Sequence, residues 1–289
     1  MTAAITPYTS LTRRKTDKRK SYTWLSYVLV FLFLIWILVP IVMVGQTSFK
    51  PSSDIFVLPP KLFFTPTLDH YTQIFSRQNF GQYLLNSVIV ALSTMLLSIT
   101  IGAISAYALA RLPIWHKERW AFLILFCRMV PAIVLLVPLF TLTRLVGLAN
   151  SYWAIIIAHT TFNLPFVIWM MRSFFEDIPV ELEEASKIDG ASRLGAFWRI
   201  ALPLTAPGLV SAAILTMLFS WNEFLFALVL SGRDTRTIPI GVASFVGTVS
   251  IDWGGSSAAA VIAMVPVFIL GLLVQRYLVR GLTMGAVKG

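Results

Sequence analysis

Charged residues are scarce in this chain. They make up 12% of its 289 residues, whereas hydrophobic residues make up 57%. Soluble globular proteins usually carry about 25% charged residues, so this composition is typical of a protein that lies in lipid. No low-complexity segment or internal repeat is visible, and no stretch suggests a second, soluble domain.

Residues for redox, metal or nucleotide chemistry are also few. Cys127 is the only cysteine, which excludes an intrachain disulfide and favours a packing role over a redox or metal role. The sequence has no glycine-rich phosphate loop, no metal-ligand cluster and no Ser, His and Asp set on a predicted loop. We therefore expect no catalytic residue, no metal site and no cofactor in this chain, and no ATP hydrolysis by it alone.

Six stretches are long and apolar enough to cross a bilayer, which takes about 20 apolar residues in a helix. They lie at about 22–44, 85–109, 121–141, 153–171, 207–230 and 258–278. The first is longer than the apolar region of a signal peptide, about 7–15 residues, and we expect it to be retained. The sequence thus predicts an all-α, polytopic membrane protein. Its parts are a basic tail over 1–21, a six-helix domain over 22–278 and a C-terminal tail over 279–289.

The net charge of +10 is unevenly placed. If both termini are cytoplasmic, sixteen lysines and arginines fall on the inner side and six on the outer side, with Arg128 left inside a span. This asymmetry follows the positive-inside rule. Because the basic residues are spread among loops beside membrane lipid, we expect no nucleic-acid partner.

A polar loop over 179–203 separates the fourth and fifth spans. Pro179 suits a first helical turn, acidic residues follow it near the positive end of the helix dipole, and Gly190 can take the left-handed conformation that ends the helix. Ser192 can cap a second helix, in which we expect one face to be formed by Leu194, Phe197, Trp198 and Ala201. This helix, glycine hinge and amphipathic helix would fit a surface or a groove on a partner. An ordinary interfacial loop is the alternative.

Polar residues within the spans form a second candidate site. Counted at about 1.5 Å per residue, similar depths are predicted for His159, Asn163, Asn222 and Glu223. They either line a transport pathway or join helices by hydrogen bonds. We favour Asn222 as pathway-facing and Glu223 as a gate or anchor paired with His159. Arg128 lies too far inward for a pair with Glu223, and a structural role at a helix end is favoured over a substrate role.

Small residues and prolines predict how the spans pack. The second span carries small side chains at spacings of three and four, which allow a close approach to a neighbouring helix: Ser98, Gly102, Ser105, Ala106 and Ala110. We expect Pro131, Pro138 and Pro165 to interrupt the third and fourth spans.

Several segments together resemble a known family. Glu184-Ala185-Ser186, then Gly190, then nine residues and Ile200-Ala201-Leu202-Pro203 resemble the EAA loop of ABC importer membrane subunits, with Ser186 where Ala is usual. Asn86-Ser87, the stretch from Ser220 to Ala227 and the tail from Gly281 to Gly289 are similar to the maltose-type carbohydrate uptake permeases, the shorter of the two membrane subunits.

The resemblance implies partners and functional residues. The partners would be a homologous second permease, two ATPase subunits that bind ATP and Mg, and an extracytoplasmic solute-binding protein, at a bacterial inner membrane. ATPase coupling would be carried by Glu184, Ala185, Gly190, Leu202 and Pro203. The loop over 231–257 would contact the binding protein through Asp252, Trp253, Gly254 and Gly255, although a plain interfacial turn explains them too.

The predicted function is that of a permease subunit in an alternating-access importer for a sugar or sugar derivative. One alternative is a proton-coupled secondary transporter, with Glu223, His159 and Arg128 as its charged groups. An ABC importer for a non-sugar solute and a membrane scaffold without solute flux are the others. The sequence does not identify the sugar, nor which of the two permeases holds the main substrate site.

Overall fold

The computed structural model describes residues 23–247 and 251–285, in which helices are joined by loops and two isolated β-bridges. The helices of ten or more residues are α1 (Thr23–Phe49), α3 (Phe80–Arg111), α4 (Lys117–Met129), α5 (Ala132–Leu145), α6 (Tyr152–Glu176), α10 (Ala206–Trp221) and α13 (Trp253–Gly285). The shorter elements are η1 (Ser52–Asp54), α2 (Asp69–Arg77), α7 (Val180–Ile188), α8 (Arg193–Ala196), η2 (Phe197–Ala201), α9 (Leu202–Leu204), α11 (Leu225–Leu230) and α12 (Ile238–Ala243). The basic tail predicted over 1–21 lies outside the described residues.

The chain divides into two units, Met1–Gln46 and Thr47–Gly289. The described part of the first unit is helical and belongs to α1, an apolar helix whose side chains are mostly exposed, as lipid contact requires. All the other helices belong to the second unit, which also contains every candidate site residue.

Four of the six predicted spans match single long helices, the third matches two helices joined by a sharp bend, and the fifth is matched by α10 over its first part only. Four helices are long and apolar enough to cross a membrane: Trp24–Phe49, Phe80–Arg111, Tyr152–Glu176 and Trp253–Gln275. Two further candidates are helix pairs, α4 with α5 bent by 92° and Arg193–Leu204 with α10 bent by 76°. Counted as one span each, they bring the total to six. The prediction of an all-α polytopic membrane protein is therefore confirmed.

Two predicted spans are broken by local chemistry. Pro131 separates α4 from α5, as expected, whereas Pro138 and Pro165 lie inside α5 and α6 and do not end these helices. The prediction of one continuous span over 207–230 is wrong. The helix α10 ends at Trp221, and the Glu223 carboxylate accepts backbone N–H groups of Phe226 and Ala227 that begin α11.

A close helix contact in the second unit joins α3 and α6. A Cβ atom on Gly102 would lie 2.5 Å from Cγ1 of Val167 on α6, so only glycine allows this approach. Ser98 and Ala106, one turn away on either side, are fully buried. The small residues of the second span therefore form a packing face, as predicted.

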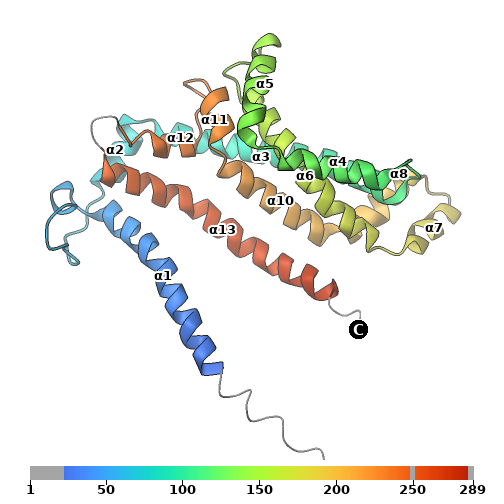
Figure 1. Cartoon of the computed structure of the whole chain (residues 1–289), viewed down its shortest axis with the longest axis horizontal. Helices are drawn as coiled ribbons and strands as arrows, with labels where there is room; N and C mark the ends of the chain where they lie inside the picture. The colour runs from blue at the N-terminus through green and yellow to red at the C-terminus, as the bar shows by residue number, and fades with distance from the viewer. Residues whose placement is uncertain (1–22, 248–250, 286–289) are drawn as a thin grey trace, which may run out of the picture. The chain divides into compact units, whose positions relative to one another are not determined.

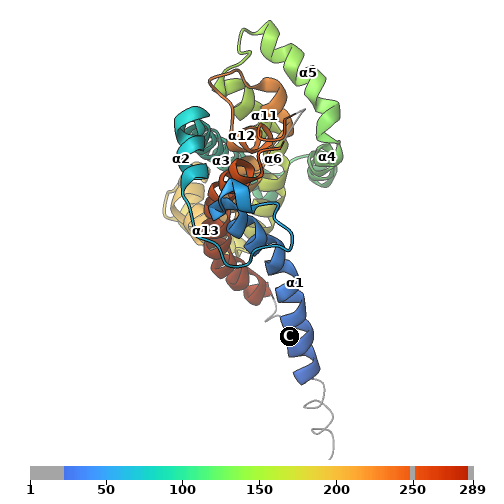
Figure 2. The ribbon, with the colours of Figure 1, turned by 90° about the vertical axis from the view of Figure 1, so that its left-hand side faces the viewer.

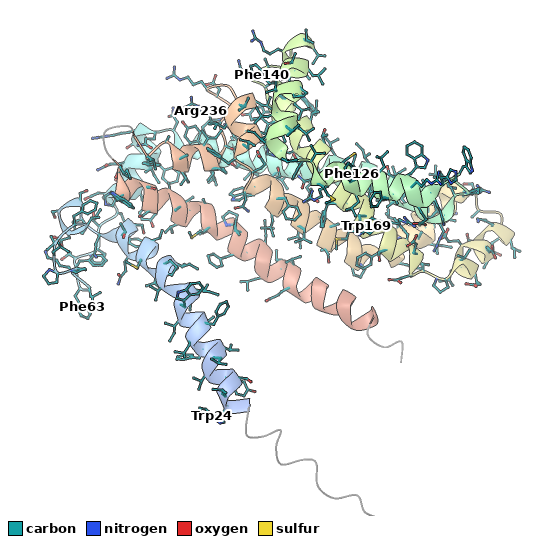
Figure 3. The ribbon with its side chains drawn as sticks, viewed as in Figure 1. Trp24, Phe63, Phe126, Phe140, Trp169 and Arg236 are labelled. Atoms are coloured by element: carbon teal, nitrogen blue, oxygen red, sulfur yellow. The ribbon has the colours of Figure 1, made fainter. Side chains whose placement is uncertain are left out.

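The second unit has loops at both ends of its long helices (Figure 1). The short helices α7 and α8 lie at one end of α3, α6 and α10, and α2 and α12 lie at the other end. Figure 2 shows α5 standing away from these helices after the bend from α4. Exposed apolar side chains cover both α4 and α5, including Phe126 and Phe140 (Figure 3), and such a surface suits lipid or another membrane protein.

Candidate functional site

The predicted helix and glycine hinge are present in the 179–203 loop. The helix α7 follows Pro179, and Gly190 has φ +88°. No atom lies within 4 Å of a Cβ built on Gly190, so the left-handed backbone, not lack of space, favours glycine there. The N–H of Ala191 donates to the carbonyl of Ser186 at 3.0 Å, which closes the helix end.

The second half of the loop differs from the predicted amphipathic helix. Ser192 does cap α8 by accepting the N–H of Gly195 at 3.1 Å. The next turn, η2, is π-helical, and the extra residue of a π turn rotates the following side chains. Phe197 and Ala201 are buried, whereas Leu194 and Trp198 are 66% and 53% exposed. Leu194, Phe197 and Trp198 nevertheless line one groove beside α3, so three of the four predicted side chains share a face, and Ala201 does not line that groove.

The residues predicted to couple to an ATPase lie mostly on the open side of the loop. Glu184, Ala185 and Gly190 are exposed, and so is Pro203. Leu202 is the exception, since it packs partly against the buried cluster that contains Phe197. A partner protein can therefore reach all of these positions except Leu202.

A buried polar group that the sequence analysis did not single out lies beneath this loop. Glu183 on α7 is 1% exposed, and its carboxylate accepts hydrogen bonds of 2.7 Å from the Tyr107 hydroxyl and from Nε of Arg111, both on α3. Arg111 also donates to the carbonyl of Ile178 at 2.7 Å. We call Glu183, Tyr107 and Arg111 the Glu183 joint. Its sequence signal is the tyrosine and arginine four residues apart at the end of α3, which share one face.

The four polar residues predicted within the spans come together at one cavity of about 360 Å³. The lining consists of Arg128, His159, Phe162, Asn163, Leu218, Phe219, Asn222, Glu223 and Val267. The cavity thus lies between α4, α6, α13 and the break after α10, where a kinked or broken helix leaves polar groups inside a membrane domain.

His159 on α6 forms hydrogen bonds across the cavity to residues near the break after α10. Its ring is 1% exposed, with Nδ1 at 2.8 Å from Ser220 Oγ and Nε2 at 3.0 Å from Glu223 Oε2. The predicted pair of Glu223 and His159 is therefore present. Glu223 also caps α11, so it accepts from His159 and from backbone N–H groups.

The two asparagines at the cavity have bonding capacity to spare. Asn163 donates to the carbonyl of His159 at 2.9 Å, but its buried Oδ1 has no hydrogen-bond partner in the described part of the chain. Asn222 is exposed and donates to the carbonyl of Leu218 in its own helix at 2.8 Å. Both can exchange hydrogen bonds with a bound molecule.

Arg128 joins this cavity from the end of α4. It donates to the carbonyl of Phe162 at 2.8 Å, and its guanidinium lies 4.9–5.3 Å from the ring centroids of Phe162, Phe166 and Phe219. Among the described residues no carboxylate forms an ion pair with Arg128, which agrees with the expectation that it does not pair with Glu223. The helix-end position was expected, whereas its place in the cavity wall was not.

The predicted binding-protein contacts lie at the start of α13. The Asp252 carboxylate caps this helix by accepting the N–H of Gly255 at 2.9 Å. Gly254 and Gly255 are buried, and a Cβ on Gly254 would collide with the His70 ring. Both glycines therefore serve close packing, and the exposed side chains are those of Trp253 and Asp252.

The comparisons with known proteins place the chain in a family. A model of the binding-protein-dependent transport system inner membrane component family matches residues 98–284. The chain belongs to this family. The matched residues include the 179–203 loop and every residue that lines the cavity. This transport component is therefore a multi-pass inner-membrane protein, and the predicted family resemblance is confirmed.

Relatives of this transport component match it along most of their length. The sulfoquinovosyl glycerol transport system permease protein SmoH of Agrobacterium fabrum is 39% identical, over 92% of this chain and 94% of the relative. The trehalose transport system permease protein SugB of Mycobacterium tuberculosis is 38% identical, over 91% and 96%. The fold is similar to that of a bacterial ABC transporter involved in alginate import, with a TM-score of 0.77 at 22% identity, over 92% of this chain and 99% of that one.

Proposed function

We propose that this chain is the permease subunit of a binding-protein-dependent ABC importer that carries a sugar or sugar derivative into the cell. The observation that carries the proposal is the pair of relatives at 38% and 39% identity, which are permease proteins of transport systems for trehalose and for sulfoquinovosyl glycerol. Both of those solutes contain a sugar ring with several hydroxyl groups.

The cavity supplies groups that suit a sugar. The unpartnered Oδ1 of Asn163 accepts from a hydroxyl, and the exposed amide of Asn222 both donates and accepts. Arg128 uses one guanidinium N–H for Phe162, which leaves others for hydroxyl or acidic oxygens. We therefore extend the proposed pathway residues His159, Asn163, Asn222 and Glu223 with Arg128 as a sugar-contacting group.

Energy for transport would come from separate subunits. The exposed side of the 179–203 loop would dock on an ATPase subunit, one of two in the complex that bind ATP and Mg, with both termini in the cytoplasm. A homologous second permease would complete the pathway, and the exposed Trp253 and Asp252 would face an extracytoplasmic binding protein. ATP binding would then turn the cavity outward, and hydrolysis would reset it.

A proton-coupled transporter is the second candidate, because His159 and Glu223 form a hydrogen-bonded pair of ionisable side chains at the cavity. The pairing also has a structural explanation, since Glu223 caps α11. The two candidates differ in their energy source. The importer stops when its ATPase subunit is removed, and the proton-coupled transporter stops when an uncoupler is added with ATP intact.

Reconstitution in liposomes tests the proposal. The chain would be purified with its partner permease, ATPase and binding protein, and uptake of labelled trehalose, sulfoquinovosyl glycerol, glycerol 3-phosphate and methionine would be measured. Uptake of a sugar derivative that needs ATP and the binding protein supports the proposal. Uptake of methionine alone, or uptake without ATP, would overturn it.

A further inference from the structure

The two ends of α3 are each fixed to a loop by buried polar side chains. At one end, Tyr107 and Arg111 bind Glu183 in the 179–203 loop. At the other end, Asn86 and Ser87 bind the segment that joins α11 to α12. These loops lie at opposite ends of the second unit (Figure 1).

Asn86 uses the full hydrogen-bonding capacity of its side-chain amide. The NH₂ group donates to the carbonyls of Asp234 and Arg236, both at 2.8 Å, and Oδ1 accepts from Gln82 at 2.8 Å and from the Tyr152 hydroxyl at 2.7 Å. The residue is fully buried. A buried amide with two donors and two acceptors in use fixes its neighbours in one geometry.

Ser87 adds a second attachment at the same end. Its hydroxyl accepts the N–H of Ile238 at 2.8 Å, at the first residue of α12. The backbone at both sides of the segment 234–238 is therefore bonded to the first turns of α3. Figure 3 labels Arg236 in this segment, on the side of the unit away from α7.

Between its two attachments α3 is one continuous helix without proline. The other described helices of at least 25 residues contain Pro40, Pro165 and Pro266, respectively, whereas the 32 residues of α3 contain none. Asn86 and Arg111 are separated by about 38 Å of helix at 1.5 Å per residue. A proline-free helix keeps its full hydrogen-bond ladder and resists bending, so a displacement of one end is carried to the other.

We propose that Glu183 and Asn86 are positioning residues for transport, which make α3 a rigid link between the 179–203 loop and the segment 234–238. Movement of α7 is passed through the Glu183 joint to α3, and through Asn86 and Ser87 to the segment at the opposite end. The proposal rests on the proposed function for the cause of the movement, which is ATP binding by the partner subunits.

The test compares matched variants in the reconstituted importer, with Cys127→Ala and Arg233→Cys as the background. Arg233 is exposed beside the segment 234–238, so its cysteine reports movement there through its rate of labelling by a maleimide. We expect ATP to change this rate in the parent complex. Glu183→Gln should reduce the ATP-dependent change about twofold or more. Asp177→Asn, an exposed change outside the 179–203 loop, should preserve it.

The opposite end is tested by Asn86→Asp, which replaces two donors by an acceptor facing two carbonyls, with the exposed Gln73→Glu as control. The binding protein stimulates ATP hydrolysis, and this stimulation is measured in each variant. If both residues act in series through α3, the double variant Glu183→Gln/Asn86→Asp loses no more of it than the more severely impaired single variant. Multiplied losses, or a normal labelling change in Glu183→Gln, would overturn the proposal. If Glu183→Gln fails to assemble, Tyr107→Phe removes one of its two bonds and serves instead. A parent complex without ATP stimulation would contradict the proposed function itself.

Discussion

The Glu183 joint and the cavity beside His159 both bury polar side chains, but they differ in how many of their groups have partners. In the joint, both carboxylate oxygens of Glu183 accept hydrogen bonds, and Arg111 also reaches a backbone carbonyl. In the cavity, Oδ1 of Asn163 has no partner among the described residues, and Arg128 has guanidinium donors to spare. A saturated cluster holds its neighbours in place, whereas one with free capacity can bind and release a solute.

The largest effect is expected where a saturated cluster is broken. Arg111→Ala leaves the buried Glu183 carboxylate without its ion-pair partner, which costs about 3–5 kcal/mol. We expect the purified complex to lose its ATPase subunits or to melt at a clearly lower temperature. Arg119→Ala, an exposed change at the start of α4, is the control. Equal melting temperatures and equal assembly of the two variants would show that the joint holds nothing in place.

A matched pair of buried asparagines sharpens the comparison. Asn86→Leu leaves four hydrogen-bonding groups without their partner, and we expect a loss of stability of about 1–3 kcal/mol or more. Asn163→Leu removes an unpartnered acceptor and one donor to the carbonyl of His159, four residues earlier in the same helix. Because only this one bond is lost, we expect stability within about 1 kcal/mol of the parent and lower sugar uptake. Thermal melting and uptake of the two variants would be compared. If Asn163→Leu destabilises as much as Asn86→Leu, Asn163 is a packing residue.

A smaller effect is expected at Gly190, the hinge of the 179–203 loop. Gly190→Ala places a side chain at φ +88°, which costs roughly 1–2 kcal/mol. The exposed position should leave membrane insertion unchanged and lower the co-purification of ATPase subunits. Gly271→Ala, in helix α13 with open space around it, is the control. Unchanged ATPase binding in Gly190→Ala would remove the hinge from the mechanism.

The elements with strong local signals were predictable from the sequence. Long apolar stretches predicted the long helices. Gly190 predicted the end of α7, and Ser192 predicted the start of α8. The similar depths of His159 and Glu223 predicted that they lie close together. These features depend on residues close in sequence or on a simple count of helical rise.

The features that were missed depend on contacts between residues far apart in the sequence. The end of α10 at Trp221 is set by Glu223, whose carboxylate bonds the backbone of α11 and also His159 on another helix. The burial of Glu183 depends on Tyr107 and Arg111, more than seventy residues earlier. The place of Arg128 in the cavity wall depends on its contacts with Phe162 and Phe219, which lie on two other helices and more than thirty residues away.

The central claim, that the Glu183 joint couples and the cavity binds the sugar, is tested most directly by one ratio. The numerator is the number of sugar molecules imported into liposomes. The denominator is the number of ATP molecules hydrolysed after the basal hydrolysis without binding protein is subtracted. We predict that Arg128→Gln lowers the ratio while binding-protein stimulation of ATP hydrolysis stays normal. Glu183→Gln should lower stimulated hydrolysis and uptake together and leave the ratio unchanged. The same change of the ratio in both variants, or the opposite assignment, would contradict the account.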